Sequence, residues 1–210
     1  MDCKLFERLQ LWIPEPGEVA GPYGIPIIRA QALPYVDEWR PFNDLSKPFD
    51  KNMGVSMYVD DYRIHRLWAS PDRYVPILAK AGVALSPDFS IYTDMPVALG
   101  IYNHYRKHWL AAYWQKHRVT VIPTICWGDE DSFAWCFDGE PTGCVVSVSS
   151  VGTQRRADTK AAFVRGYDAM MERLKPEAVL FFGIIPKECR GNICPVEAFY
   201  KTVERRCKRE

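Results

Sequence analysis

The sequence lacks any apolar run long enough to cross a membrane. A membrane-spanning helix needs about 20 consecutive apolar residues, whereas the apolar stretch near the N-terminus is short and is interrupted by Pro14 and Pro16. That interruption and the polar start Met-Asp-Cys-Lys also argue against a secretory signal peptide. We therefore expect a cytoplasmic protein with no membrane partner.

A large net charge is missing as well. The chain has 27 Lys and Arg against 26 Asp and Glu, which gives a net charge of +1. No global field therefore draws it to nucleic acid. Local basic groups remain at Arg63 with Arg66 and in the C-terminal run 205–209. Such groups are typical of solvated surface, so nucleic acid is the weakest of the partner classes.

Several familiar motifs are absent. No G-x-G-x-x-G follows a strand-like run, residues 149–153 lack the Gly-Lys-Ser/Thr ending of a P-loop, and there is no G-x-S-x-G. The seven cysteines are an odd number, and we interpret them as reduced and mostly buried. His104 and His108 share a helix face, yet no adjacent glutamate completes a zinc-protease pattern. We interpret that face as basic and solvated.

What the sequence does contain is a repeated alternation of strand and helix. Five apolar, strand-like runs each end in a small polar or acidic group, and they occupy residues 55–59, 83–85, 119–125, 145–148 and 179–182. Helical patterns lie between most of them, at 71–81, 95–117 and 156–174. This order predicts an α/β fold of mostly parallel β/α repeats. We favour an abbreviated or irregular TIM-like barrel, and an open doubly wound sheet is the alternative.

The expected organisation is simple. Residues 1–24 form a Pro- and Gly-rich extended lead-in, and residues 25–210 form a single α/β domain. We expect a first strand at 25–28 and a long polar connection over 32–52. In the helix at 95–117 the apolar stripe predicts inward positions for Ala98, Tyr102, Tyr105, Trp109 and Ala112.

Acidic residues stand at the ends of neighbouring predicted strands. Asp60 and Asp61 follow one strand, and Asp88 follows the next. Because the carboxyl ends of parallel strands meet at one edge of the sheet, these three side chains are our candidate catalytic residues. Converging carboxylates suit general acid and base catalysis or binding of a divalent cation such as Mg²⁺ or Mn²⁺. The sequence alone does not identify a metal, and turn or cap roles for the aspartates are the alternative.

Further candidates for substrate binding lie near other strand ends. Arg29 and Gln31 follow the first expected strand and offer a cation and an amide for an anionic group. Large rings and carboxylates fill the loop after residue 125, and its candidate residues are Trp127, Asp129, Asp131 and Trp135. The two indoles suit stacking on a substrate ring, while a structural plug at the end of the sheet is the alternative role.

Several sequence blocks resemble a family of unknown function, DUF4417. They read PIIRAQ, GVSMYVDDYR, ALSPDFSIYTDMP, VIPTICWGDEDSFAWCFDGEPTG, VSVSSVGT and VLFFG. The likeness spans roughly residues 22–205. It implies a cytosolic protein of the kind found in bacteria, phages and mobile elements, and it brings no catalytic residues with it.

Three functions follow as hypotheses. The first is an enzyme with a carboxylate-lined site that acts on a sugar, a nucleotide or a nucleic-acid-derived substrate. The second is a non-catalytic protein that sequesters a small nucleotide or docks on a host protein. The third is a nucleic-acid-binding accessory protein that uses Arg63, Arg66 and the basic C-terminal helix. The sequence leaves open whether the protein is an enzyme.

Overall fold

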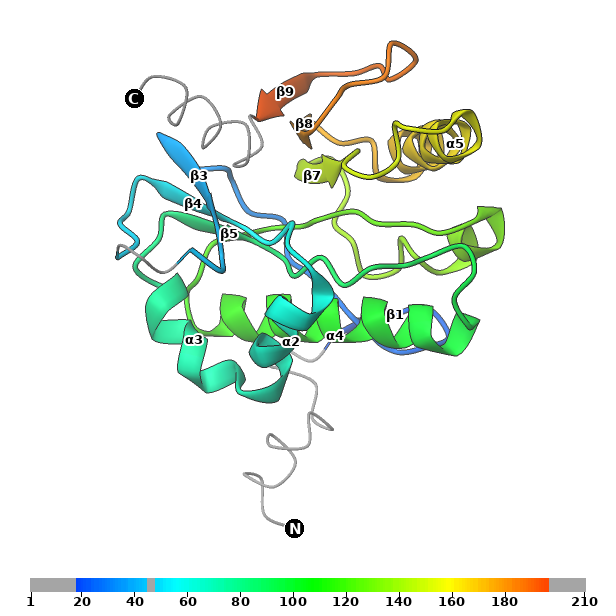
Figure 1. Ribbon diagram of the computed structural model, residues 1–210. Helices are drawn as coiled ribbons and strands as arrows, with labels where there is room; N and C mark the ends of the chain where they lie inside the picture. The colour runs from blue at the N-terminus through cyan, green and yellow to red at the C-terminus, as the bar shows by residue number, and fades with distance from the viewer. Residues whose placement is uncertain (1–17, 45–47, 197–210) are drawn as a thin grey trace.

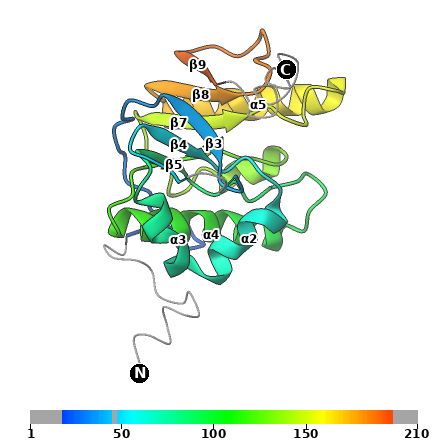
Figure 2. The ribbon, with the colours of Figure 1, turned by 60° about the vertical axis from the view of Figure 1, so that its left-hand side comes forward.

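A computed structural model describes residues 18–44 and 48–196 of the chain. It has a mixed α/β fold with two parallel sheets and four α-helices over these residues. Helices α2, α3 and α4 gather along one side of the strands, and α5 lies beside the second sheet (Figures 1 and 2). The alternation of strand and helix that the sequence predicts is therefore present.

The first parallel sheet has four strands in chain order. They are β3 (Glu38–Pro41), β4 (Met53–Ser56), β5 (Val83–Leu85) and β6 (Val121–Ile122). All three residues of β5 are buried, as are both of β6. Strands buried on both faces read as continuous apolar runs, which is why β5 and β6 show no polar alternation in the sequence.

The second parallel sheet continues the same order. It contains β7 (Val145–Ser149), β8 (Ala178–Phe182) and β9 (Ile193–Val196). A parallel bridge between Thr124, just after β6, and Ser147 of β7 joins the two sheets. The rings of Trp39 and Phe182 also meet edge to face with centroids 5.7 Å apart, which brings β3 close to β8. Over the described residues β3 does not pair with β9, so no closed barrel is formed.

The helices carry the apolar faces that cover these sheets. They are α2 (Asp61–Ala69), α3 (Pro71–Leu78), α4 (Val97–Lys116) and α5 (Ala157–Leu174). The long helix α4 has no internal proline and ends before Arg118, which has a positive φ of 65°. Pro71 opens α3, where its missing N–H costs no helical hydrogen bond.

Two expectations for the first fifty residues differ from the structure. Ile25 and Pro26 form β2, which pairs antiparallel with β1 (Val19–Ala20) and takes no part in the parallel sheets. The stretch 32–52, predicted as a polar connection, contains β3. This strand was not predicted because the charged residue Arg40 interrupts its apolar pattern. In the fold Arg40 is buried and donates to the carbonyl oxygen of Pro48.

The face that α4 buries is also different from the one predicted. Tyr102 is exposed, whereas His104, Lys107 and His108 are buried, so the interpretation of a solvated histidine face is wrong. The predicted inward position of Trp109 is confirmed. The prediction from the apolar stripe failed because other segments supply hydrogen-bond partners, and these partners offset the cost of burying the polar side chains of α4.

No helix within residues 18–44 and 48–196 is long and apolar enough to cross a membrane. The division into a lead-in and a single domain stays a prediction. The described part of the chain ends at Val196, the last residue of β9.

Candidate functional site

Polar groups converge where strands β5 and β6 end. Ser86 follows β5 and its Oγ lies 2.9 Å from Oγ1 of Thr124, which follows β6. Lys107 reaches the same place from α4, and its Nζ donates to the carbonyl oxygen of Thr124 over 3.0 Å. All three residues are buried. The carboxyl edge of the sheet therefore contains an enclosed polar centre, where the sequence placed the site.

Asp88 stands beside this centre, two residues beyond Ser86. Burial raises the pKa of its carboxyl to about 7, the ammonium of Lys107 opposes that rise, and the charge of Asp61 adds to it. Asp88 is half-buried and forms no hydrogen bond with the other described residues. A carboxyl group of this kind exchanges its proton near neutral pH, as a general acid or base must.

Asp61 faces the Asp88 segment from the start of α2. Its Oδ1 accepts from Oγ of Ser90 over 2.9 Å, and its Oδ2 accepts from the backbone N of Ser90 over 3.2 Å. Nδ2 of Asn103 donates to the carbonyl oxygen of Ser90 over 2.7 Å. Arg106 donates to Oδ1 of Asn103 and lies over the ring of Phe89. These contacts fix residues 88–90 between α2 and α4.

Two further groups interact with Asp88. The hydroxyl of Tyr58 lies 2.8 Å from Oγ of Ser147 across the junction of the two sheets. Burial raises the pKa of Tyr58 well above 10, and the charge of Asp88 adds to this, so its hydroxyl stays protonated. Burial and Asp88 likewise raise the pKa of the Cys126 thiol, so this cysteine is a neutral neighbour and not a thiolate nucleophile.

The structure separates the two adjacent aspartates. Asp61 points inward to Ser90, as described above, whereas Asp60 is exposed and pairs with Arg63 on the surface at 3.2 Å. Sequence position could not distinguish them, because the turn into α2 rotates neighbouring side chains to different sides. The structure thus brings together Asp61 and Asp88, and a catalytic role for any of the three aspartates stays a prediction.

Arg29 and Gln31 lie elsewhere. Oε1 of Gln31 accepts from the backbone N of Val121, the first residue of β6, over 2.8 Å. Gln115, in the last turn of α4, donates to Oε1 of Gln31 and to the backbone oxygen of Arg29. These contacts are at the amino end of β6, so the structure does not bring the pair to the aspartates, and substrate binding by them stays a prediction.

The loop after β6 holds the other predicted binding residues. Asp129 accepts from the backbone N of Ser132 and caps the short 3₁₀ helix η1 (Glu130–Ala134). Asp131 lines an open depression of about 250 Å³ beside Arg165 of α5. Trp127 is half-buried and packs on Phe163 with ring centroids 5.3 Å apart. Trp135 is 6% exposed. Both indoles pack within the fold, and stacking on a substrate stays a prediction.

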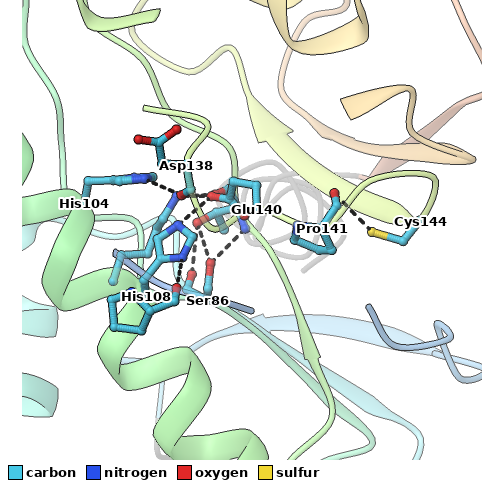
Figure 3. Close-up of polar contacts among 10 residues, drawn as sticks. Ser86, His104, His108, Asp138, Glu140, Pro141 and Cys144 are labelled. Carbon is cyan, nitrogen blue, oxygen red and sulfur yellow. Dashed lines mark hydrogen bonds and ion pairs between the residues drawn. The ribbon is translucent and has the colours of Figure 1, made fainter. Parts of the chain in front are cut away.

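A second polar cluster, which the sequence did not predict, also contacts the ammonium of Lys107. His104 and His108 of α4 meet Glu140, which comes from the loop after η1 (Figure 3). Lys107 Nζ lies 2.5 Å from Oε1 of Glu140, and Nε2 of His108 lies 3.0 Å from the same oxygen. The only signal in the sequence was the spacing of two histidines and a lysine on one helix face.

Comparison with known proteins gives a family and two relatives. The family described as "Domain of unknown function (DUF4417)" matches residues 17–199. The "Gene 1 protein" of Mycobacterium phage D29 is 41% identical over 129 residues, which is 61% of this chain and 48% of the relative. The "Gene 1 protein" of Mycobacterium phage L5 is 40% identical over 134 residues, which is 63% of this chain and 58% of the relative. The chain therefore spans about half the length of these relatives. No solved structure matches it.

Proposed function

The chain belongs to the DUF4417 family, which includes phage proteins, and on that premise we propose that it is an enzyme that transfers a proton at the carboxyl edge of its parallel sheets. The observation that carries the proposal is that Asp88, which follows β5, interacts with the charges of Asp61 and Lys107. Asp61 is bonded to Ser90, and Lys107 is bonded to Thr124 just after β6. The carboxyl edge of parallel strands is where α/β enzymes build their sites. An incomplete TIM-like barrel as the scaffold is part of the proposal, and the bridge between Thr124 and Ser147 that joins the two sheets is consistent with it.

Asp88 is the proposed general acid and base. At neutral pH its raised pKa of about 7 leaves both protonation states populated, so the same carboxyl can give a proton to a leaving group and take one from water. The buried ammonium of Lys107 stabilises the ionised form when it appears. Asp61 fixes the segment that carries Asp88 through its bonds to Ser90.

The substrate class that fits is a sugar, a nucleotide or a nucleic-acid-derived molecule, split by hydrolysis or used in group transfer. Such substrates have oxygen leaving groups that need a proton, which Asp88 supplies. The hydroxyl of Tyr58, held by Ser147, adds a neutral hydrogen-bond donor beside the carboxyl. A thiol-based mechanism is not part of the proposal, because Cys126 stays protonated.

The test is a comparison of Asp88→Asn with the wild-type protein on glycosides with alkyl leaving groups and on nucleoside mono-, di- and triphosphates, whose leaving groups need a proton. Products are separated by liquid chromatography. Because general acid–base catalysis contributes about 10²–10⁴-fold, Asp88→Asn should lower kcat by about that factor. The wild-type pH–rate profile should bend near pH 7, in line with the pKa of Asp88.

Asp94→Asn is the matched control, since Asp94 is an exposed aspartate six residues further along the chain. It should keep the wild-type rate. Full turnover by Asp88→Asn, or no turnover of any of these substrates by the wild type, would contradict the proposal. A nucleotide that stays bound in native mass spectrometry without being turned over would favour the sequestering hypothesis instead.

A further inference from the structure

Three metal-binding side chains meet inside the protein, apart from the proposed catalytic residues. His104, His108 and Glu140 each offer a ligand atom, and these atoms lie within 4.8 Å of one another. His104 and His108 are one helical turn apart on the buried face of α4, and the side chain of Glu140 is fully enclosed. Two imidazoles and a carboxylate form a common ligand set for late first-row divalent cations.

The hydrogen bonds of His108 leave its second nitrogen facing a carboxylate. Nδ1 lies 2.8 Å from the carbonyl oxygen of Pro26, which can only accept, so Nδ1 carries the hydrogen. In the neutral ring, Nε2 then presents a lone pair to Oε1 of Glu140 at 3.0 Å. Two lone pairs at this distance repel, so a positive centre, either a proton or a metal ion, belongs between them.

Other atoms of the cluster distinguish a metal ion from a proton. Nε2 of His104 lies 2.9 Å from the carbonyl oxygen of Asp138 and therefore carries the hydrogen of the neutral ring. Nδ1 of His104 and Oε2 of Glu140 are enclosed and have no hydrogen-bond partner. A single proton on His108 would satisfy neither atom, whereas a metal ion can draw ligands from all three residues. Buried polar atoms without partners are rare and call for such an explanation.

The backbone hydrogen bonds that hold the two histidines also fit a metal site. Histidines that bind a metal usually donate their other N–H to a backbone carbonyl or a carboxylate, which fixes the ring. Both histidines here do so, to Pro26 and Asp138. Gly139 is needed for this arrangement, because a Cβ there would come within 2.9 Å of Nδ1 of His108 and 2.8 Å of the oxygen of Pro26.

We propose that His104, His108 and Glu140 bind one divalent cation of the zinc class, which clamps α4 to the loop that carries Glu140. The ion shares the carboxylate with Lys107, whose ammonium lies on Oε1. Repulsion between that ammonium and the ion weakens binding, so removal of the lysine charge should strengthen it. The inference does not depend on the proposed function.

The enclosed position of the ligands decides how the experiment is done. Because the three residues are 0–8% exposed, the ion enters during folding or through local opening. The full chain is therefore produced in medium supplemented with Zn²⁺, dialysed against buffer without metal, and analysed by elemental mass spectrometry. We expect roughly one zinc ion per chain. A sample refolded with Co²⁺ should show the visible absorption of a nitrogen- and oxygen-ligated ion.

The variants are His108→Gln and Glu140→Gln, with His117→Gln as the matched control. His117 is exposed and lies just after the same helix. The first two should lose the ion and the control should keep it. If the two variants fail to fold, Lys107→Met supplies the second measurement, because it should bind Zn²⁺ about tenfold or more tightly than the wild type.

Two results would overturn the proposal. One is a wild-type protein that retains no zinc above the level of Glu140→Gln. The other is a nitrogen NMR spectrum in which His108 carries hydrogens on both nitrogens and does not change when Zn²⁺ is present during refolding. Either result would show that a proton, and not a metal ion, lies between His108 and Glu140.

Discussion

At the residue scale, burial keeps the carboxyl group of Asp88 protonated up to about pH 7. Asp88 changes from an ordinary carboxyl with a pKa of 3.8 to one with a pKa of about 7, chiefly because burial disfavours its charge. This shift in pKa makes the free energy of unfolding depend on pH. A carboxyl group whose pKa is raised by folding stabilises the native state only while it is protonated.

The pH dependence of stability follows from that shift. The stabilising effect of protonated Asp88 is complete below about pH 4 and is lost as pH rises through about 7. The loss is on the order of 4 kcal/mol at most. Asp88→Asn should therefore leave the free energy of unfolding nearly unchanged at pH 4 and raise it at pH 8. Urea unfolding at both values checks this, and Asp94→Asn should follow the wild type. An equal effect of Asp88→Asn at both pH values would contradict it.

At the scale of elements, prediction from sequence succeeded where burial and propensity agree. Apolar runs predicted the strands β4, β5, β7 and β8, and helical periodicity predicted the helices α3, α4 and α5. Strand β3 was missed because Arg40 and Pro41 resemble loop residues. The prediction of the buried face of α4 was wrong because Lys107 and His108 are buried only with Glu140 as their partner. That residue lies more than 30 positions away in the sequence. No local pattern contains such a partner, so only the fold reveals the cluster.

Helix α5 offers a test of its packing. A methyl group at Gly166 would overlap the indole of Trp127, whereas one at Gly100 of α4 would lie 3.0 Å from the ring edge of Trp135. Alanine in place of glycine favours a helix by about 1 kcal/mol at either position. Gly166→Ala should nevertheless destabilise the protein by about 1–3 kcal/mol, and Gly100→Ala should be less harmful. Thermal unfolding of the two variants checks the order, and equal stabilities would contradict the close contact.

At the scale of the whole molecule, one ring connects the two sheets. Phe182 of β8 is buried and meets Trp39 of β3 as well as Tyr58, with centroids 5.7 and 4.8 Å apart. Together with the Thr124–Ser147 bridge, these contacts hold the two sheets side by side. The sequence predicted the parallel order, but no local pattern in it shows that β3 and β9 stay unpaired over the described residues.

Phe182→Ala should make the two sheets unfold at different denaturant concentrations. Removal of a buried phenylalanine ring costs about 3–5 kcal/mol, and here the loss falls on the contact between sheets. Hydrogen exchange should show β5 and β8 opening together in the wild type and at different denaturant concentrations in the variant. Tyr92→Ala, which alters a side chain that is 59% exposed, should behave as the wild type. A shared transition in Phe182→Ala would mean that the ring does not couple the sheets.

The pairing of Lys107 with Glu140 has a consequence for synthesis on the ribosome. The chain emerges from its N-terminus, so the residues of β3 to β6 and of α4 are made before residue 140. Until Glu140 appears, docking of α4 would bury an ammonium group without its partner, which costs about 3–5 kcal/mol. We therefore expect α4 to dock stably only after the loop before β7 has been made, because the carbonyl of Thr124 gives the ammonium a hydrogen bond but no opposite charge. The buried pair thus links the packing of α4 to a segment that is synthesised later.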